Sequence, residues 1–332
     1  MFDFDYLIKK LTDACFASYP FKHIYIEDFF SSEHFEQLLA SEEIASPKAN
    51  SDDELIDGLY AKGYKVIDFP GCVTDRRKYV AWHSEGRNEP FHSACEGFGM
   101  VLRLYSIQSP ILVAINEFIA SERFNRAIAE KFDIDFEQCI TDGGIQKYLD
   151  GYEISPHPDI RRKAATFMIN INPSPLSESL NHHTHYLRLT KKREYVKSFW
   201  EGNVDIDRAW VPWDWAETVH QQKKNNSIVL FSPSNETFHG VKADYEHLKT
   251  QRTQLYGNVW YKKGHTTSKL EWEDMDLLSR KTTSYSSQPT NPIRSMIAST
   301  IPSSVKTFIK RAYRKTDVDA DKGMDLGERK TR

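Results

Sequence analysis

The segment YEISPHPDIRRK, residues 152–163, places His157 and Asp159 on either side of Pro158. Alternate residues of an extended chain point to the same side, so this imidazole and this carboxylate could reach one metal ion. The same spacing also fits a polar surface loop. The pattern alone does not decide between these interpretations, and ligands elsewhere in the chain must do so.

A third metal ligand is expected from a different strand. The best candidate is His239, in SPSNETFHGVK, which follows the apolar strand SIVLF after a short turn. Two histidines and one carboxylate on one face of an ion leave three coordination positions open, the arrangement of non-haem Fe(II) oxygenases. The alternative is a turn histidine bonded to a backbone carbonyl.

Arg252 lies thirteen residues after His239 and opens the strand RTQLYGNVWY. A buried arginine behind a metal site suits a dicarboxylate cosubstrate, because a guanidinium binds a carboxylate through two parallel hydrogen bonds. The alternative is a structural ion pair with Asp244 or Glu246.

These motifs together resemble the 2-oxoglutarate- and Fe(II)-dependent oxygenases of the prolyl-hydroxylase-like branch. The order HPD, HGV and RTQLYGNVWY matches that family's HxD, distant His and strand-opening Arg. The segments PFKHIYIEDFFSSEHFEQLLAS, YLDGYEISPHPD and FMININP are similar to the family's entry and to its approach to the first histidine. The resemblance covers roughly residues 20–262.

The resemblance implies which residues carry the chemistry. His157, Asp159 and His239 would hold Fe(II), and Arg252 would bind the C5 carboxylate of 2-oxoglutarate. Further cofactor-binding candidates are Tyr148, on the strand before His157, and, by strand parity, Thr166 and Gln254. The implied reaction is hydroxylation of a substrate with conversion of 2-oxoglutarate to succinate and CO2.

Two other groups of polar residues are candidates for metal or substrate binding. The run NHHTHYLRL carries His182, His183 and His185, which form a rival metal site or, in the preferred interpretation, a solvated loop near the active-site mouth. Arg161 and Arg162 directly follow the HPD motif and are weak candidates for contact with an anionic substrate.

Composition limits the other function classes. The 332 residues carry a formal net charge of -3, so no bulk attraction to nucleic acid is expected. The four cysteines are scattered without a CxxC pair, which fits a reducing compartment. The N-terminus is acidic and no long apolar run occurs, so the sequence predicts a cytoplasmic protein.

The predicted fold is α+β, mainly β, with a double-stranded β-helix (jelly-roll) core and supporting N-terminal helices. Helices are expected over residues 5–17, from residue 31 or 32, and over 109–132 with a break near Ala120–Ser121. Strands are expected near 23–29, 64–69 and 97–106, and then densely from residue 139, where Gly143–Gly144 is interpreted as a turn.

The chain divides into a catalytic domain, 1–265, and a C-terminal region, 266–332. Within the first, residues 172–226 are interpreted as a polar insertion or lid. The second combines a Ser/Thr-rich connector, a basic amphipathic segment at 293–315 and a polar tail predicted to be disordered. Segment 293–315 suits contact with an anionic membrane surface or docking on a protein.

Two alternative functions remain at this point. One is a cupin-like metalloprotein that uses no 2-oxoglutarate, against which Arg252 argues. The other is a non-catalytic β-sandwich that binds carbohydrate or peptide through the Trp-rich stretch SFWEGNVDIDRAWVPWDWAE. A halogenating relative is disfavoured because Asp159 is present. The substrate is not identified, and a protein side chain, a glycan and a small molecule all remain open.

Overall fold

The structure is a computed structural model that describes residues 2–45, 48–68, 72–85 and 97–263. Its helices are α1 (Asp5–Asp13), α2 (Ser32–Ala40), α3 (Asp52–Ala61), α4 (Arg76–Ser84), α5 (Pro110–Ala120), α6 (Glu122–Lys131) and α7 (Tyr195–Gly202). Its strands are β1 (Ile24–Ile26), β2 (Tyr64–Val66), β3 (Val101–Leu104), β4 (Cys139–Tyr148), β5 (Glu153–His157), β6 (Lys163–Asn170), β7 (Thr184–Leu189), β8 (Ala216–Gln221), β9 (Ile228–Phe231), β10 (His239–Lys242) and β11 (Arg252–Tyr261).

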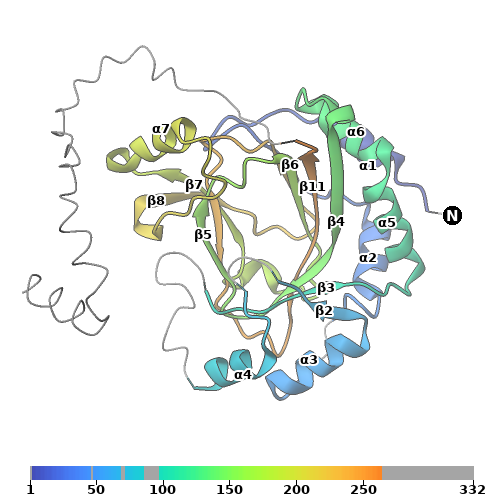
Figure 1. The fold of residues 1–332 in the computed structure, drawn as a ribbon. Coiled ribbons are helices and arrows are strands. Elements are labelled where there is room, and N and C mark those ends of the chain that lie inside the picture. Colours follow the sequence, from blue (N-terminus) through green and yellow to red (C-terminus); the bar gives the residue numbers. More distant parts are fainter. Residues whose placement is uncertain (1, 46–47, 69–71, 86–96, 264–332) are drawn as a thin grey trace, which may run out of the picture. The chain divides into compact units, whose positions relative to one another are not determined.

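Two antiparallel sheets face each other (Figure 1). The seven-stranded sheet has the order β1-β9-β6-β11-β4-β3-β2, and the four-stranded sheet has the order β5-β10-β7-β8. From β4 onward, most strands therefore lie in the opposite sheet from the strand before them. Among these consecutive pairs, only β7 and β8 lie side by side in the same sheet. This mixed α/β arrangement is compatible with the predicted jelly roll.

Helices cover the outer face of the larger sheet. Figure 1 shows α1, α2, α5 and α6 on the side of β4 that faces away from the smaller sheet. Strand residues of one parity, such as Leu255 and Val259 of β11, pack into the hydrophobic core with these helices. Residues of the other parity face the space between the sheets. The period-two alternation of β11 thus separates a core face from a functional face.

The predicted break in the helical region 109–132 is confirmed at Ser121. Its extended backbone (φ -66°, ψ 144°) ends α5, and its hydroxyl accepts a hydrogen bond from the N–H of Phe124 at the start of α6. A serine that stops one helix and caps the next accounts for the change of direction without a loop.

The predicted turn at Gly143–Gly144 is wrong, because both residues lie inside β4. Gly143 is paired with Gly257 of β11, and a side chain at Gly143 would approach the carbonyl of Tyr256 to 2.8 Å. A side chain on Gly257 would meet the ring of Phe167 at 2.2 Å. These glycines serve close packing across three strands rather than a reversal of the chain.

The expected insertion at 172–226 is also wrong in part. This segment contains β7 and β8, which make up half of the smaller sheet. Strand β8 is an edge strand without a buried residue, so its composition is polar. Edge position, rather than absence of structure, explains why AETVHQ lacks the apolar signal of a core strand.

A buried charge cluster joins helices α3 and α4 to the loop before β11. Nδ1 of His83 lies 2.8 Å from Asp52 Oδ2, and Nε2 of His83 lies 3.1 Å from Asp150 Oδ2. His247 Nε2 lies 2.7 Å from the other oxygen of Asp52. Burial opposes the charged ring, but hydrogen bonds to Asp150 and Asp52 outweigh it and raise the pKa of His83 to about 9.

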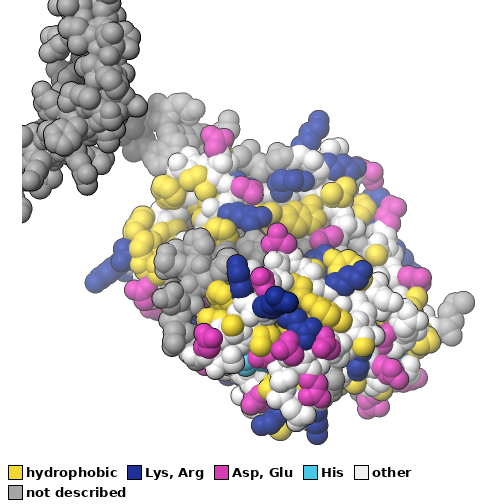
Figure 2. Space-filling view, turned by 60° about the horizontal axis from the view of Figure 1, so that its bottom comes forward, with side chains coloured by type: hydrophobic (Ala, Val, Ile, Leu, Met, Phe, Trp, Pro, Cys, Tyr) yellow, Lys and Arg dark blue, Asp and Glu magenta, His cyan; other side chains and the backbone are white. Residues whose placement is uncertain are grey.

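The surface and the C-terminal region bear on the expected partners. On the face shown in Figure 2, described Lys and Arg side chains are interspersed with Asp and Glu rather than gathered over one broad area. Among the described helices, none has the length and apolar character that a membrane crossing requires. The predicted connector, basic segment 293–315 and disordered tail lie outside the described residues.

The His83 cluster predicts that stability falls from neutral to alkaline pH. A raised pKa means that the stabilisation is fully present below the unfolded value near 6.5 and is lost as pH rises through about 9. We expect the free energy of unfolding to fall by on the order of 2 kcal/mol across this window. Denaturant unfolding at several pH values measures it. In His83→Gln the pH dependence should flatten, and an unchanged slope in that variant would contradict this assignment.

Candidate metal centre and active-site cavity

The three predicted metal ligands converge at the open space between the sheets. His157 ends β5, His239 begins β10, and the two are direct partners in the antiparallel pairing. One ligand atom from each of His157, Asp159 and His239 lies within 4.8 Å of the other two. All three side chains are buried, so the group forms an enclosed cluster rather than a surface loop.

Backbone carbonyls orient both imidazoles. Nδ1 of His157 lies 2.8 Å from the carbonyl of Ser155, and Nδ1 of His239 lies 2.9 Å from the carbonyl of Thr237. A carbonyl only accepts hydrogen bonds, so each Nδ1 carries the proton and donates it. The lone pair of each Nε2 is therefore free for the ion, as in most histidine metal sites.

Asp159 reaches the histidines by a route that the sequence analysis did not predict. The segment is not extended through residue 159, because β5 ends at His157 and Asp159 has φ 73°. This left-handed conformation is uncommon for residues other than glycine and tends to persist at functional sites. It brings the Asp159 oxygens to 3.8 Å from Nε2 of His157 and 3.9 Å from Nε2 of His239.

The protonation states of the three side chains suit the binding of a cation. Burial, followed by the neighbouring His239, lowers the pKa of His157 to about 3, and burial also lowers the pKa of His239. Burial alone would raise the pKa of Asp159, but the Lys163 ammonium holds it well below its usual range. Near neutral pH the site thus offers two neutral imidazoles and one carboxylate.

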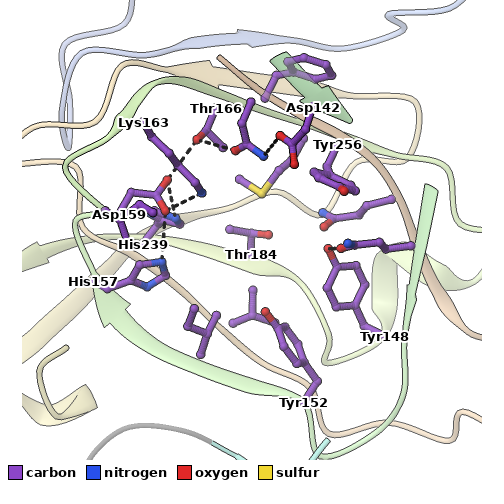
Figure 3. Close-up of a pocket in the computed structure, with 18 of the residues that line it drawn as sticks. Asp142, Tyr148, Tyr152, His157, Asp159, Lys163, Thr166, Thr184, His239 and Tyr256 are labelled. Atoms are coloured by element: carbon purple, nitrogen blue, oxygen red, sulfur yellow. Dashed lines mark hydrogen bonds and ion pairs between the residues drawn. The ribbon is translucent and has the colours of Figure 1, made fainter. Parts of the chain in front are cut away.

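A cavity of about 360 Å³ extends from the triad between the two sheets. Figure 3 shows the triad on one wall, Tyr148 and Tyr256 on the opposite wall, and Thr184 between them. The cavity is also lined by residues of one parity from β11, namely Arg252, Gln254, Tyr256, Asn258 and Trp260. Its volume falls within the range of small-molecule binding sites.

Arg252 carries a buried positive charge in the cavity wall. Its side chain donates a hydrogen bond to Thr184 Oγ1 at 3.0 Å, and its guanidinium lies 4.4 Å from the ring centroid of Tyr148. Its Nη1 is buried and has no hydrogen-bond partner. Among the described residues no carboxylate pairs with it, so the expected alternative of an ion pair with Asp244 or Glu246 is not found.

The remaining cofactor candidates lie around the same cavity. Tyr148 is paired with Arg252 across β4 and β11, and Gln254 shares the cavity face of β11 with Arg252, as its parity predicts. Thr166 lies nearer the triad, where its hydroxyl is 3.1 Å from Asp159 Oδ2. Two of the three candidates therefore flank Arg252, and the third contacts Asp159, a predicted metal ligand.

The two arginines after the HPD motif do not line the cavity. Arg161 donates to the carbonyls of Ile206, Trp200 and Asn203, and its guanidinium lies 3.8 Å from the ring centroid of Trp200. These contacts fix the end of α7, a structural role in place of the suggested substrate contact. Arg162 is exposed.

The expected solvated histidine loop is wrong. His182 and His183 are buried, and Arg252 is among the charges that lower their pKa values, after burial and, for His182, the His183 ring. Only His185 is partly exposed, beside Thr218 and the ring of Trp213. The run therefore packs behind the arginine instead of forming a loop at the mouth.

Sequence reasoning missed three residues of the site. Lys163 lies 2.7 Å from Asp159 Oδ1, Thr184 contacts Arg252, and Asn258 contacts Thr166. The parity of β11 could have found Asn258, six positions after Arg252. For Thr184 the sequence carries no comparable signal, because its contact with Arg252 depends on the pairing of distant strands. Lys163 lies only four positions after Asp159, but the sequence does not reveal the left-handed backbone at Asp159.

A second group also has metal-ligand composition. Asp52, His83 and His247 offer ligand atoms within 4.8 Å of one another. Here, however, ring nitrogens and carboxylate oxygens already meet in hydrogen bonds of 2.7 and 2.8 Å. The ligand atoms of this cluster are therefore already engaged with one another, although Nδ1 of His247 is buried without a hydrogen-bond partner, and we interpret the group as an ion-pair cluster.

Comparison with known proteins gives a likeness of fold. No family model matches the chain, and no curated protein matches it in sequence. The chain is similar to solved 2-oxoglutarate- and Fe(II)-dependent oxygenases. A prolyl-4-hydroxylase from Pseudomonas putida aligns with 78% of this chain and 98% of its own, at 10% identity and a TM-score of 0.39.

Two further structures show the same level of similarity. A prolyl hydroxylase from Trichoplax adhaerens, in complex with a hypoxia inducible factor peptide fragment, covers 79% of this chain and 90% of its own, at 10% identity and TM-score 0.37. HygX from Streptomyces hygroscopicus, with nickel, 2-oxoglutarate and hygromycin B bound, covers 68% and 93%, at 10% identity and TM-score 0.29. At such low scores the assignment of the site rests on its own geometry.

Asp159→Asn is expected to weaken divalent metal binding while the fold persists. Asparagine tolerates the left-handed conformation but removes the negative charge, so Co(II) affinity should fall by about 100-fold or more. Titration of the Co(II) absorption bands measures the affinity. Asp68→Asn, at an exposed acid that lines the same cavity, is the matched control and should bind Co(II) like the wild type.

Proposed function

We propose that this protein is an Fe(II)- and 2-oxoglutarate-dependent dioxygenase that hydroxylates an organic substrate. The observation that carries the proposal is the pairing of two features in one cavity. A buried two-histidine, one-carboxylate cluster lies on one wall, and a buried arginine without an anionic partner lies in the same cavity. Such a cavity suits a ligand that chelates a metal at one end and carries a carboxylate at the other.

The residues present fit both absent groups. His157 and His239 would bind Fe(II) through Nε2, and Asp159 would bind it through its carboxylate. The free Nη1 of Arg252 would meet the distal carboxylate of 2-oxoglutarate, because a desolvated guanidinium without a counter-charge is costly. Tyr148 and Thr184 flank this guanidinium and would fix its direction.

Together Fe(II) and 2-oxoglutarate would supply dioxygen activation, coupled to conversion of the keto acid to succinate and CO2 and to transfer of an oxygen atom into a substrate C–H bond. The chain's own part is positional. The carbonyls of Ser155 and Thr237 hold the imidazoles, and Arg252 would set the direction of the cosubstrate.

The strand order supports a double-stranded β-helix for residues 139–261. Strands β4, β11, β6 and β9 are contiguous in the larger sheet, and β5, β10, β7 and β8 form the smaller one. Eight strands divided in this way between two facing sheets are compatible with the predicted jelly roll. In this arrangement β5 and β10 place the histidines, and the start of β11 places Arg252.

The alternatives lack a specific supporting observation. A cupin-like metalloprotein without 2-oxoglutarate would leave the Arg252 charge buried and unpaired. A carbohydrate- or peptide-binding sandwich would leave the buried triad unexplained, and Trp200, one of its proposed stacking residues, is itself buried. The substrate class stays open among protein side chains, glycans and small molecules.

Anaerobic titration with Fe(II) and 2-oxoglutarate tests the cofactors directly. We expect a weak visible charge-transfer band that requires both additions and disappears in Asp159→Asn, because the chelate needs an intact triad. Fe(II) with succinate is the matched control and should give no band. A wild-type protein that binds Fe(II) but shows no band would favour the cupin alternative.

Arg252→Met is expected to separate cosubstrate binding from stability. Without anions, replacing an unpaired buried cation with an apolar side chain should raise the free energy of unfolding by about 1–3 kcal/mol. The stabilisation that 2-oxoglutarate gives to the metal-loaded protein should be lost. Thermal unfolding with and without 2-oxoglutarate measures both effects. A destabilised variant that is still stabilised normally by 2-oxoglutarate would contradict the assigned role.

A further inference from the structure

Lys163 is a cation directly beside a proposed metal ligand. It is the first residue of β6, and its Nζ lies 2.7 Å from Asp159 Oδ1. The Lys163 side chain is 16% exposed and that of Asp159 is 5% exposed, so the pair is shielded from solvent. A positive charge at this place is unexpected, since it opposes the binding of a divalent cation by the same carboxylate.

The two oxygens of Asp159 are held in different ways. Thr166 lies 3.1 Å from Oδ2, but its hydroxyl has a second acceptor in Asn258 Oδ1 at 3.2 Å. The amide of Asn258 is oriented for this role, because its Nδ2 donates to Asp142 at 2.8 Å. A hydroxyl has one proton, so Thr166 can turn to Asn258 and release Oδ2 without loss of a hydrogen bond.

Lys163 has no comparable alternative among the described residues. Besides Asp159 Oδ1, its ammonium lies near the ring of Trp260, at 5.5 Å from the centroid. Release of Oδ1 would leave a largely buried ammonium with only that ring as a partner, which is costly. The structure thus contains one carboxylate oxygen that is easily freed and one that is firmly held.

We propose that Lys163 is a positioning residue that retains Oδ1 of Asp159 and restricts this carboxylate to binding the metal through Oδ2 alone. The inference rests on the proposed function. A carboxylate bound through one oxygen leaves three positions open on a six-coordinate ion. Binding through both oxygens would leave two, which a chelating cosubstrate would fill. Lys163 would thereby preserve the position that dioxygen needs, at some cost in metal affinity.

Mn(II) alone, a redox-stable probe for the same ligands, allows a direct test. Longitudinal relaxation of water protons per bound Mn(II) reports the number of water molecules on the ion, and titration gives the affinity. In Lys163→Met we expect this relaxation to fall by about a third, as one of three open positions is lost. Mn(II) affinity should rise about tenfold, because a neighbouring positive charge is removed and a second oxygen binds.

Two matched variants separate position from charge and folding. Lys163→Arg retains a cation that can pair with Asp159 and should resemble the wild type in both measurements. Lys242→Met removes the same charge three residues after His239, from a side chain that is 62% exposed, and should also resemble the wild type. If Lys242→Met reproduces the changes of Lys163→Met, the effect is general electrostatics and the proposed role is overturned.

The remaining outcomes are distinct for the two proposals. A wild-type protein that binds Mn(II), with hydration and affinity unchanged in Lys163→Met, overturns the role of Lys163 and leaves the proposed function intact. A wild-type protein that binds no divalent metal overturns the proposed function and, with it, this role. Lower hydration with tighter binding in Lys163→Met alone supports the proposal.

Discussion

The central constraint in this protein is the burial of the Asp159 carboxylate. A carboxylate removed from water requires cations or hydrogen-bond donors, and the chain supplies Lys163 and Thr166. Both partners come from β6, and the two neutral imidazoles beside the carboxylate come from the end of β5 and the start of β10. The cavity lies beside this carboxylate, between the two sheets.

Arg252 is a buried charge of the opposite sign in the wall of the same cavity. Its charge is buried without a described acid, and aromatic rings and neutral hydrogen-bonding groups surround it. The protein therefore contains a set of metal-ligand groups that suits a cation and a positive charge that suits an anion. The separation of these two charges by a cavity of about 360 Å³ favours a ligand with two different ends.

The sequence predicted which residues meet at the site better than it predicted the backbone conformation around them. His157, His239 and Arg252 were predictable because strand ends and period-two parity are local properties. The left-handed conformation of Asp159 was not predictable, because the motif was assumed to be extended through residue 159. Gly143–Gly144 was misinterpreted because its cause is the packing of β11, more than a hundred positions later in the chain. The polar strand β8 was missed because an edge strand needs no apolar face. The charge cluster around His83 was also not predicted, because the partners of His83 lie 31 and 67 positions away in the chain.

The charge cluster of His83 also joins the helical region to the site. Asp150 accepts a hydrogen bond from the N–H of Tyr245, and the hydroxyl of Tyr245 accepts one from the N–H of Arg252 and donates to the carbonyl of Tyr148. A chain of hydrogen bonds thus connects the charged side chains of α3 and α4 to the backbone N–H of Arg252. In evolutionary terms, the β core is not a freely transferable module. Recombination that exchanged the first eighty-five residues would also have to preserve Asp52 and His83, so the helices and the core are expected to be inherited together.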